Sequence, residues 1–131
     1  VRVEGALLQM GDIHATMGDG EICGTGIEVP GEIMVNTSII KGCELNWPVL
    51  ETEDKWYVIA SADEYPEALK NACKEAQRLL TLAYGWDKTD AYLYMSVQVD
   101  IEICQACKPC EVPLIVRAGI PKCAYKKPLI K

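Results

Sequence analysis

The 131-residue sequence has no phenylalanine and a single histidine, His14. Val, Ile, Leu and Ala therefore supply most of the apolar side chains, and hydrophobic residues make up 50% of the chain. That share is typical of a folded globular protein and excludes a disordered one. The length allows one domain, or one domain and part of another. Any role that needs an imidazole falls on His14.

The sequence also lacks long apolar runs. None approaches the roughly 18 residues that a membrane span needs. The first ten residues, VRVEGALLQM, have no basic flank, no long apolar stretch and no small-residue cleavage site of the kind a signal peptide carries. We therefore expect a cytoplasmic protein that does not bind a membrane.

Basic clusters are nearly missing. The chain has 13 Lys and Arg against 19 Asp and Glu, a net charge of -6, and its basic cluster is the stretch YKKPLIK near the C-terminal end. Proteins that bind phosphate backbones gather Lys and Arg on one surface. The composition therefore disfavours a nucleic-acid partner.

Three familiar catalytic and cofactor motifs are absent. The sequence has no Gly-x-Ser-x-Gly nucleophile elbow, no phosphate-binding loop and no Gly-x-Gly-x-x-Gly that opens a helix. We expect no organic cofactor.

Seven cysteines, an odd number, occur without an export signal, which argues against a complete disulfide framework. We expect reduced thiols. Cys104, Cys107 and Cys110 have the C-x2-C-x2-C spacing of iron–sulfur ligands, but only Cys123 follows them, and residues 112–120 read as a strand. We favour small buried thiols, and a cluster or zinc site is the alternative.

The apolar pattern changes along the chain. Residues 4–10, 22–29, 31–40, 47–52 and 55–61 read as strands, so the first half is predicted to be mainly β. Residues 66–84 then have apolar positions three and four apart, with Pro66 at the start and Gly85 at the end, as in an amphipathic helix. A short helix capped by Thr89 and strands at 97–103 and 112–120 complete an α+β pattern.

The stretch GDIHATMGDGEICGTGIE, residues 11–28, places His14 and four carboxylates among glycines. In an extended segment, residues two apart point to the same side, so Asp12 would project with His14, and Asp19 with Glu21. A carboxylate beside an imidazole is half of a zinc-type site. Two alternatives remain: the glycines form plain turns, or Cys23 is a nucleophile with His14 as its base.

The stretch EGALLQMGDIHATMGDGEICGTGIEVPGEI resembles the central segment of the acetamidase/formamidase family. The resemblance rests on Gly11-Asp12-x-His14-Ala15, on Gly18-Asp19-Gly20-Glu21 and on Cys23-Gly24-Thr25, and it continues more weakly downstream. It implies hydrolysis of formamide or acetamide to ammonia and the carboxylate. Cys104, Cys107 and Cys110 depart from the family's usual residues.

Family members are about twice this length or more, so the resemblance implies the C-terminal part of a longer two-domain enzyme. Residues 1–45 would be strands that complete a β-sandwich or barrel-like domain and carry the loop. Residues 46–131 would be a smaller α+β portion with one long amphipathic helix. A missing N-terminal half or a companion chain, and a homo-oligomer, are the expected partners.

The resemblance also implies a divalent metal, with zinc preferred. Asp12 and His14 are then the candidate ligands, and Glu28 is a further ligand, an orienting group or a structural ion-pair partner. Glu21 or Asp19 would act as general base and then as proton donor to the leaving ammonia, and His14 is counted with them as catalytic. The alternative is a non-catalytic structural subunit or a thiol-rich metal-binding module of the same fold.

Overall fold

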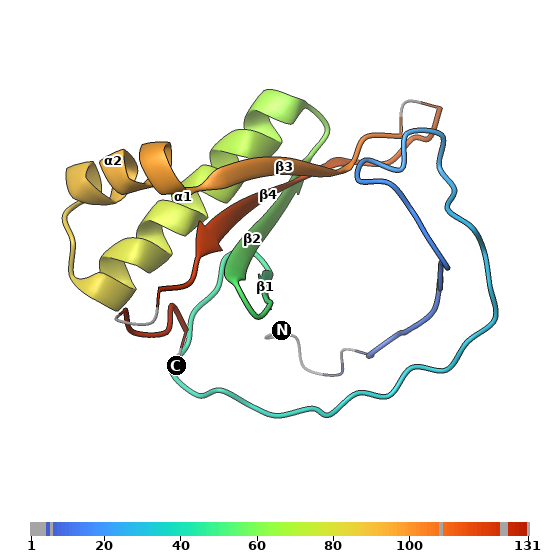
Figure 1. The fold of residues 1–131 in the computed structure, drawn as a ribbon, viewed down its shortest axis with the longest axis horizontal. Coiled ribbons are helices and arrows are strands. Elements are labelled where there is room, and N and C mark those ends of the chain that lie inside the picture. The colour runs from blue at the N-terminus through green and yellow to red at the C-terminus, as the bar shows by residue number, and fades with distance from the viewer. Residues whose placement is uncertain (1–4, 6, 108, 124–125, 131) are drawn as a thin grey trace.

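The computed structural model describes residues 5, 7–107, 109–123 and 126–130, and the elements begin only at Val49 (Figure 1). They are β1 (Val49–Glu51), β2 (Lys55–Ala62), α1 (Tyr65–Tyr84), α2 (Lys88–Gln98), β3 (Asp100–Gln105) and β4 (Leu114–Pro121). The strands form one antiparallel sheet in the order β1-β2-β4-β3. The predicted α+β class is confirmed.

Helix α1 packs against β2 and β4 and forms the core with them. It includes residues 66–84, with Pro66 in its first turn, and it ends at Gly85, whose φ of 70° lies in the left-handed region. Its buried residues include three alanines, which let the helix lie close to the sheet, and three larger residues: Ala68, Ala72 and Ala76, with Glu75, Leu79 and Leu80. No helix in the described part of the chain is both long and apolar enough to cross a membrane.

Helix α2 differs from the prediction at both ends. Asp87, not Thr89, caps its N-terminus, because the Asp87 carboxylate accepts a hydrogen bond from the backbone N–H of Asp90 at 2.9 Å. The helix continues through Val97 to Gln98, so β3 begins at Asp100 and not at residue 97. Apolar and polar residues alternate over 97–103, but only the part from Asp100 onward forms a strand.

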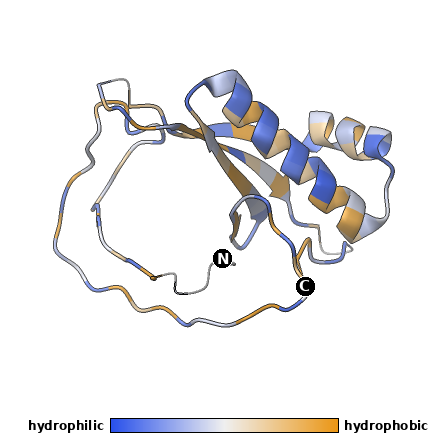
Figure 2. Cartoon of the chain, turned by 180° about the vertical axis from the view of Figure 1, so that it is seen from behind, coloured by the Kyte–Doolittle hydropathy of each residue, from blue (hydrophilic) through white to orange (hydrophobic). Residues whose placement is uncertain are grey.

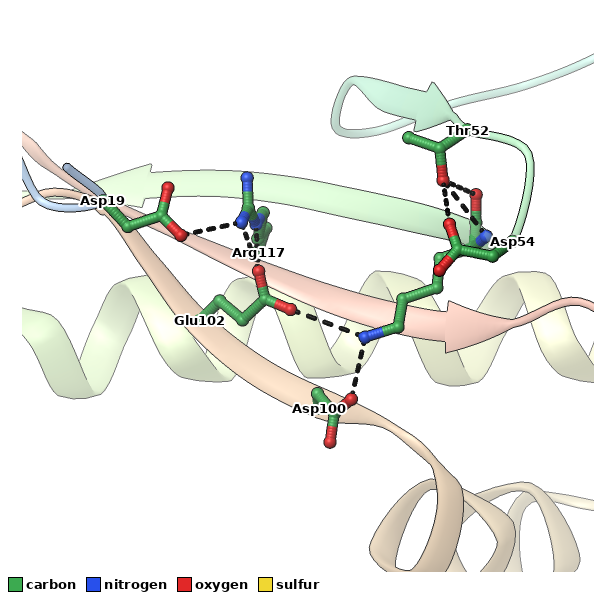
Figure 3. Close-up of polar contacts among 7 residues, drawn as sticks. Asp19, Thr52, Asp54, Asp100, Glu102 and Arg117 are labelled. Atoms are coloured by element: carbon green, nitrogen blue, oxygen red, sulfur yellow. Dashed lines mark hydrogen bonds and ion pairs between the residues drawn. The ribbon is translucent and has the colours of Figure 1, made fainter. Parts of the chain in front are cut away.

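The sheet face opposite α1 carries a network of charges (Figure 3). Lys55 of β2 lies 2.8 Å from the carboxylate of Asp100 on β3, and Arg117 of β4 pairs with Glu102 on β3. Arg117 also reaches Asp19, 3.0 Å away, in the glycine-rich loop. The network therefore ties this loop to the sheet.

Residues 7–45, which we call the arm, run as a wide arc. Around Gly20 the arm meets the end of β3, and the rest lies mostly away from the sheet and helices (Figure 1). The strands predicted at 22–29 and 31–40 are not found, and residues 7–10 form no strand either; the rest of 4–10 lies outside the described residues apart from Gly5. Among the described residues there is thus no β-sandwich or barrel-like portion. A strand needs a hydrogen-bonding neighbour, and the arm makes only isolated bridges.

Hydrophobic residues are interspersed with polar ones along the arm (Figure 2), and many of its apolar side chains are open to solvent. Met34 is 95% exposed and Ile39 is 87% exposed. Apolar surface of this extent normally marks an interaction site. The sequence of the arm therefore has a strand-like pattern, but in the described structure the arm makes only isolated bridges and no ladder with a neighbouring strand.

The end of the arm is fixed to α1 by a buried carboxylate. Glu75 is only 2% exposed and accepts hydrogen bonds from Arg78, from the backbone N–H of Asn46 at 2.9 Å and from the Asn46 side chain at 2.8 Å. Burial alone would raise the pKa of Glu75, but these hydrogen bonds outweigh burial and leave the pKa below its usual value.

The expectation of reduced thiols is wrong for one pair, because Cys107 and Cys110 form a disulfide. The C-x2-C spacing places their Cα atoms 5.3 Å apart, within the range that a disulfide bridges. Cys23, Cys73, Cys104 and Cys123 remain thiols. The bond removes two of the three thiolates that an iron–sulfur or zinc site at 104–110 would use.

Candidate metal and catalytic site

A short antiparallel pairing inside the glycine-rich loop, residues 11–28, brings His14 opposite Glu28. Backbone hydrogen bonds join the two segments from Ala15 to Ile27, from Ile27 to Thr16 and from Val29 to Ile13, at 2.8, 2.9 and 3.1 Å. Residues directly opposite each other in such a pair have neighbouring side chains. The loop is therefore closed by its own backbone, and His14 and Glu28 share one side of it.

Two carboxylates converge on one imidazole nitrogen. Nε2 of His14 lies 2.6 Å from Oε1 of Glu28 and 3.4 Å from Oδ1 of Asp12, and the candidate ligand atoms of the three residues all lie within 4.8 Å of one another. The His14 side chain is 11% exposed, whereas those of Asp12 and Glu28 are 82% and 60% exposed. The result is an almost buried imidazole that faces two open carboxylates.

Asp12 reaches this position by a turn and not by strand alternation. Its φ of 57° lies in the left-handed region, which Asp occupies more readily than most residues. The predicted pairing of Asp12 with His14 is thus present, but its geometric reason is different.

Gly26 makes room for the His14 ring. A Cβ placed on Gly26 would lie 2.8 Å from Cγ and 2.9 Å from Nδ1 of His14. Contacts this short force one group to move. The absence of a Cβ at Gly26 therefore permits the orientation of the His14 ring that turns its Nε2 toward Asp12 and Glu28.

We predict that Gly26→Ala weakens zinc binding by about 10-fold or more, because groups that orient ligands typically contribute 10- to 100-fold in metal affinity. Isothermal titration with zinc measures the change. Gly18→Ala is the matched control, since a Cβ there has nothing within 4 Å. Equal zinc affinity in the two variants would contradict the role given to Gly26.

The other two loop carboxylates lie on the end of the sheet. Asp19 binds Arg117, and Oε2 of Glu21 accepts a hydrogen bond from Nε2 of Gln105 at 2.6 Å. Between them, Gly20 pairs with the end of β3: its N–H donates to the Cys104 carbonyl at 3.3 Å and its carbonyl accepts from the Ala106 N–H at 2.7 Å. Neither carboxylate belongs to the group around His14 Nε2.

Gln105 and Arg117 are site residues that the sequence did not reveal. They lie 84 and 98 positions from their loop partners. Only the pairing of β3 with β4 brings them to one end of the sheet, and no local pattern signals it.

Within the described part of the chain, no thiol belongs to the group of side chains that converges on His14. Cys23 is exposed and is not part of the group that converges on His14. Burial raises the pKa of the Cys104 thiol, although Arg117 acts in the opposite direction, so this thiol stays protonated at neutral pH.

The converging group lies on an open surface. A cavity of about 490 Å³ lies at the opposite end of the sheet, where β2 begins and β4 ends. It is lined by Trp56, Tyr84, Lys122 and neighbouring residues, and its lining includes none of residues 11–28. Small-molecule sites normally bury most of the ligand's surface. Among the described residues, the Asp12 and Glu28 carboxylates are open to solvent, at 82% and 60% exposure, and are not enclosed in this way.

Comparison with known proteins gives a consistent picture. The sequence profile of the acetamidase/formamidase family matches residues 1–126, and no curated protein matches. An acetamidase structure from Bacillus halodurans is 27% identical with a TM-score of 0.75, and a predicted acetamidase/formamidase from Thermoanaerobacter tengcongensis is 29% identical with a TM-score of 0.76. An acetamidase from Yersinia enterocolitica is 29% identical with a TM-score of 0.68.

In each of these three comparisons, 82% of this chain is covered. The covered shares of the other proteins are 36%, 35% and 32%, in the same order. The chain thus spans about a third of the length of the solved structures it matches.

Proposed function

The chain belongs to the acetamidase/formamidase family, and from this premise we propose that it serves in the hydrolysis of a small aliphatic amide, formamide or acetamide, to ammonia and the carboxylate. The observation that supports this most is the convergence of Asp12 and Glu28 on Nε2 of His14. An amide carbonyl is a weak electrophile, so its hydrolysis at neutral pH needs polarisation of the oxygen and an activated water.

The donor set fits a divalent metal. One imidazole nitrogen and two carboxylate oxygens are ligands that zinc accepts, and they already face one point. Asp12, His14 and Glu28 would hold the ion. When bound, it would supply Lewis-acid polarisation of the amide oxygen and activation of water.

Glu21 is our candidate for the proton transfers. Its carboxylate would accept a proton from the attacking water and pass it to the nitrogen, because ammonia leaves readily only once the nitrogen is protonated. Asp19 is the weaker candidate for this role, since it is paired with Arg117.

We propose that the rest of the family's fold covers the arm, supplied by a missing N-terminal half or by a companion chain. The arm's exposed apolar residues and the open surface around His14 support this arrangement. Residues 1–45 would then join a β domain as strands, beside the α+β portion of residues 46–131. A homo-oligomer of the completed enzyme is also expected.

The substrate class is tested with the active assembly by measuring ammonia release from formamide, acetamide and benzamide. We expect turnover of the two small amides and little or none of benzamide, because the proposed substrates are small aliphatic amides. Absence of ammonia release from both small amides would contradict the proposal and favour a non-catalytic structural subunit.

A further inference from the structure

Gln105 connects the loop to the end of the sheet through both ends of its side-chain amide. Its Nε2 donates to Oε2 of Glu21 at 2.6 Å, and its Oε1 accepts from the backbone N–H of Cys107 at 2.8 Å. A backbone N–H can only donate, so the amide oxygen must face Cys107. The NH₂ group must then face Glu21, which has to be the acceptor.

A β-bulge aims Gln105 at the loop. Glu102 pairs with Arg117 and Ile103 with Val116, but Gln105 pairs with Ile115, so β3 contains an extra residue between Ile103 and Gln105. Regular alternation would send Gln105 to the side of Ile103, whereas the bulge sends it to the side of Glu102. Bulges re-aim side chains in this way and are frequent beside active sites.

The Cys107–Cys110 disulfide fixes the backbone N–H that donates to the Gln105 side-chain oxygen. Cys107 is almost fully buried and bonded to Cys110. Both sulfurs contact Gly24, since a Cβ on Gly24 would lie 2.5 Å from Sγ of Cys110 and 3.0 Å from Sγ of Cys107. The Gly24 N–H in turn donates to the Glu21 carbonyl at 2.8 Å. The turn that carries Glu21 is therefore held at both its backbone and its side chain.

We infer that Gln105 is a positioning residue that holds the Glu21 carboxylate as a hydrogen-bond acceptor, in the orientation from which it exchanges a proton with the substrate. The inference rests on the proposed function of Glu21 as the base. A single fixed N–H donor leaves the other carboxylate oxygen for proton transfer. Gln105 itself needs no contact with the amide substrate.

The variant Gln105→Glu tests this role in the active assembly. It preserves the side chain's shape and the acceptor for the Cys107 N–H, but it places an oxygen against Glu21. We expect kcat for formamide to fall about 10-fold, while KM and zinc content stay within about twofold. Gln77→Glu is the matched control, because the side-chain amide of Gln77 on α1 donates a comparable hydrogen bond to the carbonyl of Lys88, the first residue of α2, at 2.8 Å.

A swapped pair separates positioning from folding. In the double variant Gln105→Glu/Glu21→Gln the donor and acceptor change places, so the melting temperature lost in Gln105→Glu should return while kcat stays low. If Gln105→Glu does not fold, Gln105→Met replaces it and should show the same loss of kcat. If kcat is unchanged in the folded Gln105 variant while Glu21→Gln is inactive, Gln105 is not a positioning residue, and the proposed role of Glu21 still holds. Full activity of Glu21→Gln overturns the role of Glu21 and the inference with it.

Discussion

Replacing His14 by alanine is expected to lower amide turnover by about 100-fold or more in the active assembly. His14 is the only imidazole in the sequence, and its Nε2 is the atom on which both Asp12 and Glu28 converge. The variant removes a ligand or a proton carrier, whichever role the imidazole serves. The fold should survive, because His14 lies in the arm and outside the core of the sheet and helices. Ammonia release and circular dichroism on the same sample measure both.

Three further variants separate the roles of the loop residues. Asp12→Asn should lower metal occupancy as well as turnover. Glu21→Gln should lower turnover with little change in metal content, because it keeps the side chain's shape and removes only the proton acceptor. Glu32→Gln, an exposed carboxylate of the same arm, is the control and should behave like the parent protein. If the His14→Ala protein folds, keeps its metal and turns over amide within a few-fold of the parent, the loop is only a glycine-rich turn.

Replacing Glu75 by alanine is expected to lower the free energy of unfolding by about 3 kcal/mol. This is the typical cost of removing one partner of a buried ion pair, because the other partner is left without its counter-charge. Glu75 is 2% exposed, and its loss would strip Arg78 and Asn46 of their shared acceptor. Urea denaturation measures the change. Glu67→Ala is the matched control: Glu67 pairs with Lys70 at 3.0 Å on the same helix, but both side chains are 52% exposed. Such exposed pairs contribute about 0.5 kcal/mol or less.

The Glu75 cluster also predicts a pH dependence. Because hydrogen bonds hold the pKa of Glu75 below its usual value of 4.5, the folded state favours the charged carboxylate. This contribution to stability is complete above pH 4.5 and is lost as the pH falls through the lower, folded-state pKa. The variant Glu75→Gln should therefore lose less stability than the parent on acidification below pH 4.5. Equal acid sensitivity of the two proteins would contradict the assignment.

The sequence predicts best the features that depend on local periodicity. The spacing around Leu79 and Leu80 places a helix over 66–84, and the alternation around Val58 places a strand over 55–61; α1 and β2 occupy these positions. The arm shows the limit of the same reasoning. Residues 31–40 have a strand-like pattern, but pairing depends on neighbours far along the chain, and the arm forms no strand.

The candidate site divides in the same way. Asp12, His14 and Glu28 come from one stretch of 17 residues, whose own backbone pairing gathers them, so the residue types alone point to them. Gln105 reaches the loop only through the bulge in β3, which no local pattern announces. The sequence does not predict the Cys107–Cys110 disulfide either. An odd number of cysteines argues against a complete disulfide framework, but it says nothing about a single pair.

Zinc-dependent ammonia release tests most directly whether Asp12, His14 and Glu28 hold a metal ion that serves in the hydrolysis of a small amide. The active assembly is stripped with a chelator, assayed with formamide, and then titrated with zinc. We expect loss of turnover on stripping and recovery that saturates near one zinc per chain, with no recovery in His14→Ala. Undiminished turnover in protein shown by elemental analysis to be metal-free would contradict this role of the metal.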